Sequence, residues 1–421
     1  NSIAVIGLGY VGLALSVELS KYYRVVGFDI DASRVDELNN SIDRTQEVSN
    51  EHLLESINKN KLSFSSLETS LNGIDFFIIA VPTPVNERFE PDLSIVESAS
   101  QLIGRVISKG SIVVYESTVY PGVTEDVCIP IINQVSGMEG GRDFYFGYSP
   151  ERINPGDVNS SVTNVVKITS GCCKESSKVI NDVYSKIITA GTYEAESIKV
   201  AEAAKVFENV QRDVNIALVN EFSILCNALK IDTSDVLDAA GTKWNFMKFS
   251  PGLVGGHCIG IDPYYLIHKA NSLGYSLDLT MQARKINESM PYFIVQELKN
   301  VLLQNNSPIK DIRVLIMGYT FKEDCPDIRN TKVKDIINNI YEFTSSVDIY
   351  DPWVSASDKY KSGFNFIEEL GDNYDAVIVA VKHTSFQNLT INEWNNILKE
   401  KPVLFDLKGC CNNEIESDFS L

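Results

Sequence analysis

One cysteine in this chain of 421 residues stands in a setting that favours chemistry. Cys258 follows two glycines and a histidine, and Asp262 comes four residues later. The glycines permit a turn that exposes and orients the thiol, and a thiolate is strongly nucleophilic near neutral pH. Such a group can attack a carbonyl carbon and later leave, which is covalent catalysis. The other cysteines lack such a flanking motif and are interpreted as small apolar residues.

The start of the chain carries the pattern of a dinucleotide-binding turn. A short β-branched run leads into Gly7-Leu8-Gly9-Tyr10-Val11-Gly12. A helical pattern follows, and then a second strand that ends at Asp29. The glycines permit a tight turn at which a pyrophosphate can approach the helix N-terminus. Asp29 would bind the adenosine ribose hydroxyls and repel a 2′-phosphate, which favours NAD over NADP; Arg34 could instead accommodate that phosphate.

A nicotinamide cofactor together with Cys258 indicates a particular kind of oxidation. A thiol that captures a carbonyl group allows oxidation through a covalent thioester. A simple alcohol oxidation would end at an aldehyde or a ketone. The combination therefore predicts an acid as the product.

The elements around these motifs predict an α/β chain with three regions. In the first region, strands are expected at 2–6, 24–28, 74–81, 111–115, 144–148 and 164–168. Polar or turn residues follow each strand, as expected where parallel strands deliver loops to a ligand crevice. Long helices follow at 198–229, 233–241 and 277–303, and a second α/β unit has strands at 312–317, 347–350, 375–381 and 402–407. We expect two Rossmann-like domains joined by a long central helix and a helical domain, with boundaries 1–195, 196–305 and 306–421.

Composition narrows the classes of partner. Lys+Arg 37 against Asp+Glu 56 gives a net charge of −19, which argues against a nucleic-acid or anionic-membrane surface. The 8 cysteines lack CxxC spacing, so neither a metal site nor a disulfide framework is predicted. No apolar run approaches the roughly 20 residues of a membrane span, and a strand already occupies the first residues, so no signal peptide is expected. These features predict a cytoplasmic protein with reduced thiols.

Five motifs occur in order along nearly the whole chain. After the glycine fingerprint come Glu116-Ser117-Thr118-Val119, Ser149-Pro150-Glu151-Arg152, Glu208-Asn209 and Gly255-Gly256-His257-Cys258. Together they resemble the UDP-glucose/GDP-mannose dehydrogenase family. The resemblance implies a homodimer of chains with two Rossmann-like domains. It also implies oxidation of the C6 alcohol of a nucleotide sugar to a carboxylate, with two NAD used per sugar.

The same resemblance implies catalytic roles. Cys258 would attack the intermediate aldehyde to form a thiohemiacetal, whose oxidation gives a thioester that water hydrolyses. Lys205 and Asn209 lie four residues apart on one predicted helix and therefore share a face. By the resemblance they would contact the reacting oxygen and stabilise its developing charge. Asp262 and Thr118 would position a water molecule and take part in proton transfer.

Glu151 is, by the resemblance, the candidate acid or base for thioester turnover. Cofactor contacts are expected at Gly7, Gly9, Tyr10, Val11, Gly12, Asp29, Arg34, Thr83, Thr118 and Arg329. Substrate contacts are expected at Glu151, Arg152, Lys205, Asn209, Phe249, Gly252, Gly255, Phe321 and Lys322. Residues 249–256 resemble the loop that wraps the uridine diphosphate, where glycines let the backbone approach phosphate oxygens.

Two local differences bear on the sugar. UDP-glucose dehydrogenases carry Cys-x-Pro-Lys-Asp where this chain has Cys258-Ile259-Gly260-Ile261-Asp262. They also use an arginine of the neighbouring subunit near the position of Thr242, which Lys243 follows here. The segments 149–157 and 262–266 instead resemble the branch that acts on UDP-N-acetylhexosamines. Within it they are most similar to the UDP-N-acetylglucosamine and UDP-N-acetylgalactosamine 6-dehydrogenases of Vi-antigen and O-antigen pathways.

The leading hypothesis is therefore a UDP-N-acetylhexosamine 6-dehydrogenase for surface polysaccharide synthesis. The C4 epimer stays open, because one inverted hydroxyl needs only a small change in pocket contacts. UDP-glucose 6-dehydrogenase and UDP-N-acetylmannosamine dehydrogenase are the enzymatic alternatives. A two-electron hydroxyacid dehydrogenase would need neither Cys258 nor a second nucleotide-binding domain. A non-catalytic nucleotide-sugar binder would be expected to have lost some of the catalytic residues.

Overall fold

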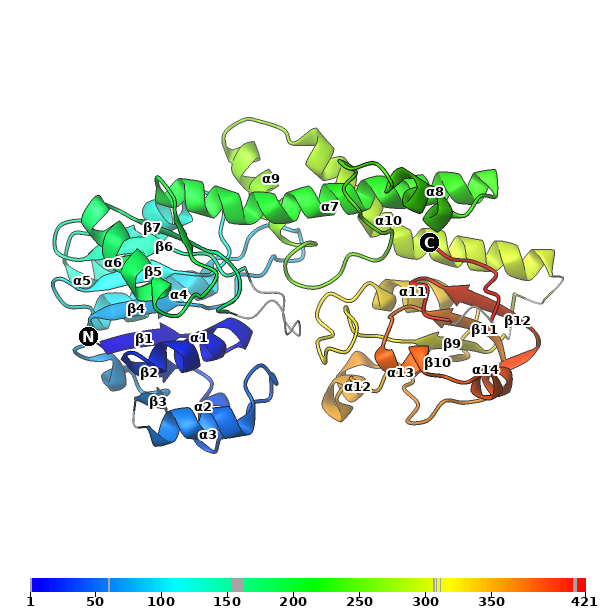
Figure 1. The fold of residues 1–421 in the computed structure, drawn as a ribbon, viewed down its shortest axis with the longest axis horizontal. Helices are drawn as coiled ribbons and strands as arrows, with labels where there is room; N and C mark the ends of the chain where they lie inside the picture. The colour runs from blue at the N-terminus through cyan, green and yellow to red at the C-terminus, as the bar shows by residue number, and fades with distance from the viewer. Residues whose placement is uncertain are drawn as a thin grey trace. The chain divides into compact units, whose positions relative to one another are not determined.

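The computed structural model describes residues 2–59, 61–152, 162–305, 307, 309–310, 312–411 and 415–421 (Figure 1). The chain forms two compact units. The first comprises Asn1–Glu208 and Tyr264–Tyr275, and the second comprises Asn209–Pro263 and Ser276–Leu421. One large sheet lies in each unit.

The sheet of the first unit has the topology of a dinucleotide-binding fold. Its strands are β1 (Ser2–Ile6), β2 (Arg24–Phe28), β3 (Leu62–Ser65), β4 (Phe76–Ile79), β5 (Ile112–Tyr115), β6 (Tyr145–Tyr148), β7 (Lys167–Gly171) and β8 (Thr192–Glu194). They lie in the order β3-β2-β1-β4-β5-β6-β7-β8. The pairings from β3 to β6 are parallel. The chain order reverses between β1 and β4, which is where such sheets bind their ligand.

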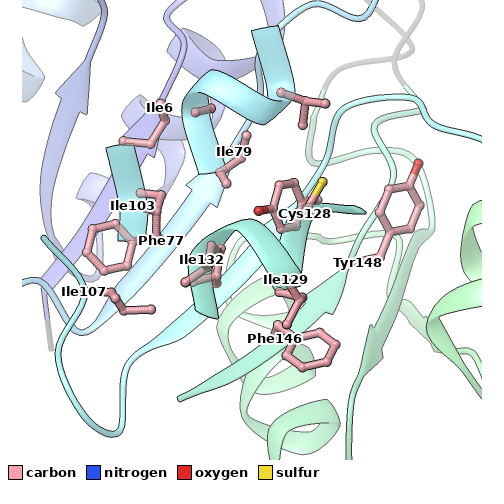
Figure 2. Packing of buried hydrophobic residues seen from close by; sticks show 14 of the residues in the cluster. Ile6, Phe77, Ile79, Ile103, Ile107, Cys128, Ile129, Ile132, Phe146 and Tyr148 are labelled. Atoms are coloured by element: carbon pink, nitrogen blue, oxygen red, sulfur yellow. The ribbon is translucent and has the colours of Figure 1, made fainter. Parts of the chain in front are cut away.

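Both faces of this sheet are buried under helices. Successive side chains of a strand point to opposite faces, so each strand contributes to both cores. Ile6 belongs to the apolar core on one face and Val5 to the core on the other. Figure 2 shows the first of these cores, in which Phe77 of the sheet packs near Ile103 and Ile132 from the covering helices. The strands therefore consist of nearly continuous apolar runs.

Helices cover this sheet. They are α1 (Tyr10–Ser20), α2 (Ala32–Asn39), α3 (Asn50–Asn58), α4 (Ser94–Val106), α5 (Ile129–Ser136) and α6 (Lys174–Ser185), with the short turns η1 (Glu68–Leu71) and η2 (Thr124–Cys128). Local capping explains where some of them begin. Asp31 accepts a hydrogen bond from the backbone N–H of Ser33 at the start of α2, and Cys173 and Ser176 cap α6 reciprocally.

The second unit is a smaller Rossmann-like fold. Its strands β9 (Val314–Met317), β10 (Val347–Tyr350), β11 (Tyr374–Val379) and β12 (Leu398–Asp406) pair in parallel in the order β10-β9-β11-β12. Ile316 and Met317 point into the cores on opposite faces of the sheet. The helices of this unit are α8 (Thr233–Ala240), α10 (Asp278–Gln304), α11 (Val333–Ile340), α12 (Ala356–Ser362), α13 (Thr384–Gln387) and α14 (Ile391–Ile397).

Two helices contribute residues to both units. The longer, α7 (Ile198–Leu229), has 32 residues and therefore a length of about 48 Å. The other is α9 (Asp262–Ser272), whose first residues belong to the second unit. The predicted fold class, two Rossmann-like parts joined by a long helix, is confirmed. In the part of the chain that the structure describes, no helix has the length and apolar character needed to cross a membrane.

One predicted strand was wrong in both its residue range and its direction. A strand was expected at 164–168, but β7 is Lys167–Gly171 and pairs antiparallel with β6. The β-branched residues of the segment favoured the earlier position. The pairing of Gly147 with Gly171 decides the actual one, because a Cβ at Gly147 would lie 2.1 Å from the carbonyl oxygen of Ser170. Thr169 and Ser170 therefore lie within the strand rather than in a loop at the ligand edge.

Candidate active site

The β1–α1 turn is shaped by its glycines. Gly7 has a φ of +93°, and a Cβ there would lie 2.8 Å from the carbonyl oxygen of Ala80. A Cβ at Gly12 would lie 1.8 Å from the carbonyl oxygen of Gly7, so this contact also requires glycine. A Cβ at Gly9, by contrast, would meet nothing within 4 Å, and no side chain caps α1 there. Open space before uncapped N–H groups fits a pyrophosphate. Tyr10 and Val11 form the first residues of α1.

Asp29 lies at the end of β2, beside this turn. Its Oδ2 accepts a 2.8 Å hydrogen bond from the backbone N–H of Leu8, and its Oδ1 accepts one from Asp31. The carboxylate therefore supports the turn from which it is expected to reach the ribose. The glycine turn and this acid together fit NAD.

Arg34 is held beneath the same turn. Its Nε donates to the carbonyl oxygen of Leu8 at 3.0 Å, and its Nη2 donates to Asp43 at 2.7 Å. The side chain is only 5% exposed. The structure thus gives Arg34 contacts that support the turn, and a direct contact with the cofactor stays a prediction. Nothing in the sequence singled out Asp43.

Two predicted residues meet where β4 and β5 end. The Oγ1 of Thr83 donates a 2.6 Å hydrogen bond to the carbonyl oxygen of Thr118. Both side chains are half-buried. The contact brings one predicted cofactor residue together with one predicted catalytic residue.

A buried ion pair underlies the segment with Glu151. Glu116, at the end of β5, accepts hydrogen bonds from Tyr184 and, at 2.6 Å, from Lys167. Lys167 also donates to the carbonyl oxygen of Pro150 at 3.0 Å, which ties this segment to the sheet. Lys167 was not predicted from the sequence, although a single cation in an apolar strand was a usable signal.

Glu151 and Arg152 come directly after Pro150 in the sequence. Arg152 pairs with Glu208 of α7 at 2.9 Å and donates to the carbonyl oxygen of Val166. A small cavity here is lined by Val11, Leu15, Glu116, Glu151, Arg152, Val162, Val165, Val166 and Lys167. It brings Glu151 close to Val11 of the cofactor turn. The remainder of this motif, residues 153–157, lies outside the described residues.

In the second unit, three predicted catalytic residues gather at the start of α9. Asn209 Nδ2 donates a 2.6 Å hydrogen bond to Oδ2 of Asp262. The backbone N–H of Asp262 donates to the carbonyl oxygen of Cys258 at 2.8 Å, which places the thiol residue one turn before the carboxylate. Asn209 and Asp262 are buried, whereas Cys258 is half-buried. Lys205 is also buried, one helical turn before Asn209 on α7, and belongs to the first unit.

The predicted substrate loop is tied to α7. Asn220 binds both backbone groups of Gly252: its Oδ1 accepts from the N–H at 2.7 Å, and its Nδ2 donates to the carbonyl oxygen at 3.0 Å. Lys408 lies over the same glycine, since a Cβ there would be 2.3 Å from its Nζ. Asn220 and Lys408 were missed, because their partners in the loop are distant in sequence. Phe249 is half-buried at the start of the loop.

Phe321 packs against the turn that precedes Cys258. Gly256 has a φ of +80°, and a Cβ there would lie 2.9 Å from the Phe321 ring. A Cβ at Gly255 would lie 2.9 Å from the carbonyl oxygen of Asn330, whose Nδ2 donates to the carbonyl oxygen of Gly256. The structure therefore brings two predicted substrate residues, Gly255 and Phe321, into contact range. The adjacent Lys322 is half-buried.

Arg329 and His257 complete this region. The guanidinium of Arg329 pairs with Asp327, with Nε 2.8 Å from Oδ1. Burial, and to a smaller extent the positive charge of Arg329, lower the pKa of His257 to about 4. The imidazole beside Cys258 is therefore neutral at physiological pH.

A parallel sheet with a glycine-rich first turn and an acid after β2 defines an NAD-binding dehydrogenase fold. Comparison with known families makes this specific. The UDP-glucose/GDP-mannose dehydrogenase family matches with its NAD binding domain at residues 1–188, its central domain at 199–289 and its UDP binding domain at 315–413. The chain belongs to this family and is an NAD-dependent dehydrogenase with a UDP-binding domain.

Relatives resemble the chain over nearly its full length. It is 50% identical over 421 residues to UDP-N-acetyl-D-glucosamine 6-dehydrogenase of Pseudomonas aeruginosa, covering 100% of this chain and 99% of the relative. Identity to the protein of the same name in Salmonella typhi is 49%, covering 96% of this chain and 95% of that protein. The solved structure of UDP-D-ManNAc dehydrogenase from Pyrococcus horikoshii matches with a TM-score of 0.91 at 28% identity, covering 100% of this chain and 98% of that one.

Proposed function

We propose that this dehydrogenase oxidises the C6 alcohol of a UDP-N-acetylhexosamine, UDP-N-acetylglucosamine or UDP-N-acetylgalactosamine, to the uronic acid for surface polysaccharide synthesis. The identity of 49–50% to two UDP-N-acetyl-D-glucosamine 6-dehydrogenases supports the choice of sugar. The observation that carries the chemistry is the gathering of Cys258, Asp262 and Asn209 at the start of α9.

The reaction balances as a four-electron oxidation. Bound NAD would accept the hydride in each of two oxidations, so one alcohol, one water and two NAD+ give one acid, two NADH and two protons. After the first oxidation, Cys258 Sγ forms a bond to C6 of the aldehyde, giving a thiohemiacetal. The second oxidation leaves a thioester. Water then attacks C6, the C–S bond breaks, and the thiolate is restored.

Fixed donors are proposed to stabilise the charge on the reacting oxygen. Lys205 supplies a cation and Asn209 an amide donor from one face of α7. The hydrogen bond between Asn209 and Asp262 supports a shared role, in which Asp262 holds the attacking water. Thr118 assists the first proton transfer, and Glu151 acts as acid or base in thioester hydrolysis.

Binding of the two nucleotides is assigned to different regions. NAD is proposed to lie on the β1–α1 turn, with Asp29 at its ribose and Thr83, Thr118 and Arg329 as further contacts. The sugar nucleotide is proposed to contact the loop 249–256 together with Arg152, Phe321 and Lys322. The family domains at 1–188, 199–289 and 315–413 each fall inside one of the proposed domains 1–195, 196–305 and 306–421.

We further propose a cytoplasmic homodimer that contacts its second copy through α7. Leu218, Leu225 and Leu229 are 62%, 51% and 59% exposed. Their spacing of seven and four residues places them on one face of the helix. Exposed apolar side chains gathered on one face mark an interaction surface. The cytoplasmic location is supported by the cysteine spacing, which does not suit a disulfide framework.

The test of the substrate is NADH release measured together with sugar consumption on four UDP-sugars in parallel. UDP-N-acetylglucosamine, UDP-N-acetylgalactosamine, UDP-N-acetylmannosamine and UDP-glucose are compared at equal concentration. We expect two NADH per sugar on one of the first two. Preference for either of the others overturns the choice of sugar, and one NADH per sugar overturns the thioester route.

A further inference from the structure

Glu202 on α7 is a fully buried acid that the catalytic scheme above does not use. Its carboxylate accepts two backbone hydrogen bonds, from Gly122 at 2.6 Å and from Thr124 at 3.0 Å. Both donors belong to the segment that leaves β5 and enters η2. Glu202 thus ties this segment to α7 across 80 and 78 positions of sequence.

The segment that Glu202 holds carries Thr118, four residues before Gly122. Its other end is anchored by the 2.6 Å hydrogen bond from Thr83 to the carbonyl oxygen of Thr118. Between the anchors, Gly122 has a φ of +102°, and a Cβ there would lie 2.5 Å from Oδ2 of Asp126. The backbone therefore turns at a positive φ that favours glycine, directly at the first bond to Glu202.

The same face of α7 carries Lys205. Positions three apart on a helix are neighbours on its surface. Lys205 is 3% exposed, so its side chain is held within the protein like that of Glu202. The carboxylate consequently bonds the Thr118 segment to α7 within one turn of Lys205.

We propose that Glu202 is a positioning residue for the dehydrogenase reaction, which fixes the segment that carries Thr118 against the face of α7 that carries Lys205. This inference rests on the proposed catalytic roles of Thr118 and Lys205. The side chain acts through the backbone of Gly122 and Thr124 and touches neither substrate nor cofactor. An acid suits the task because a carboxylate accepts both N–H bonds, whereas an amide offers one acceptor and one donor.

Ionisation of Glu202 gives the proposal a second readout. Burial raises the pKa of Glu202 to about 7, although the two backbone donors and Thr124 act to lower it. Titratable and charged groups around it are Glu97, Tyr120, Glu125, Asp126, Cys128, Lys199, His268 and Lys269. The ionised form accepts both bonds best, so the rate is expected to fall as pH falls through about 7.

The experiment compares Glu202→Gln with the wild type and with Glu125→Gln. Glu125→Gln removes one negative charge from the same neighbourhood, but Glu125 pairs with the side chain of Lys199 at 3.7 Å rather than with the backbone of the segment. For Glu202→Gln we expect kcat to fall about tenfold, the effect of losing one hydrogen bond. The fall of kcat as the pH falls through about 7 should disappear. Amide hydrogen exchange should become faster over residues 118–124. Glu125→Gln should keep the rate and the exchange. It should also keep the fall of kcat at acid pH, moved toward lower pH, because the negative charge of Glu125 helps to raise the pKa of Glu202.

A second variant covers the case in which Glu202→Gln folds poorly. Glu202→Asp keeps the charge but is one methylene shorter, so it cannot reach both donors. We expect it to lose rate as well, and full activity of this variant overturns the proposal. A wild-type kcat in Glu202→Gln overturns it too.

Failure of the proposed catalytic roles has a different signature. In that case Thr118→Ala and Lys205→Ala keep their rates, while Glu202→Gln still speeds exchange over residues 118–124. If only the positioning role is wrong, Thr118→Ala and Lys205→Ala lose rate and Glu202→Gln does not.

Discussion

The amide of Asn209 and the carboxylate of Asp262 are joined by a 2.6 Å hydrogen bond in which Nδ2 donates to Oδ2. Both side chains are almost fully buried, at 4% and 2% exposure. The bond connects α7 to the first residue of α9, immediately after the Cys258 turn. A buried carboxylate with a directed donor keeps its orientation, which suits the water-holding role proposed for Asp262.

Removing this donor should affect both stability and rate. In Asn209→Ala, Oδ2 of buried Asp262 loses the donor, and we expect the free energy of unfolding to fall by about 1–3 kcal/mol. We also expect kcat to fall at least about tenfold, because a proposed oxyanion donor is lost. Urea unfolding and initial rates measure the two effects. Asn215→Ala is the control, since its Nδ2 donates to the carbonyl oxygen of Gln211 in the same helix. Equal losses in both variants would refute a special role for Asn209.

Replacing the thiol should separate binding from turnover. Cys258→Ser is expected to bind the UDP-sugar with unchanged affinity. It should lose steady production of acid, because the serine oxygen is a poorer leaving group than a thiolate at neutral pH. Titration calorimetry and product analysis test these two statements. Cys173→Ser is the matched control: this cysteine caps α6, where serine is a favoured residue. Acid production at the wild-type rate by Cys258→Ser would rule out the covalent route.

The choice between NAD and NADP should depend on Asp29. Asp29→Asn keeps a side-chain oxygen for the Leu8 N–H but removes the negative charge that would repel a 2′-phosphate. We expect the ratio of kcat/KM for NAD over NADP to fall about tenfold, a loss of roughly 1.4 kcal/mol of discrimination. Asp31→Asn, which alters the nearby cap of α2, should leave the ratio unchanged. An unchanged ratio in Asp29→Asn would place the discrimination elsewhere.

Stability should depend on pH through His257. Burial and the charge of Arg329 lower its pKa from 6.5 to about 4. Between these values the unfolded chain binds a proton that the folded chain does not, so this group lowers the free energy of unfolding as pH falls. From pH 7 to pH 5 the wild type should lose about 2 kcal/mol more than His257→Gln. Urea unfolding at both pH values measures the difference, and parallel losses would contradict a buried neutral imidazole.

Residues whose partners are close in sequence were predictable. The glycine turn and Asp29 belong to one βαβ unit, so their spacing alone indicated a dinucleotide site. Cys258 and Asp262 lie one turn apart, and Lys205 and Asn209 share a face of a helix with regular apolar spacing. Local geometry sets these distances, and the sequence displays them directly.

Supporting contacts were not predictable, because their partners are far apart along the chain. Lys167 meets Glu116 across 51 positions, and Asn220 meets the Gly252 backbone across 32. Arg34 likewise donates to Asp43, a contact that its sequence position did not indicate, while its predicted contact with the cofactor stays a prediction. Burial and pairing decide such contacts.

The sequence by itself determined the periodicity of the strands and helices, the cofactor turn and the order of the family's motifs. These features depend on backbone sterics and on spacings within a few turns. Only the tertiary structure decided that Asn209 bonds Asp262, that Glu202 holds the segment after Thr118, and that β7 runs antiparallel to β6. Each of these depends on which polar groups are buried together, because a buried donor or acceptor must find its partner wherever the packed chain supplies one.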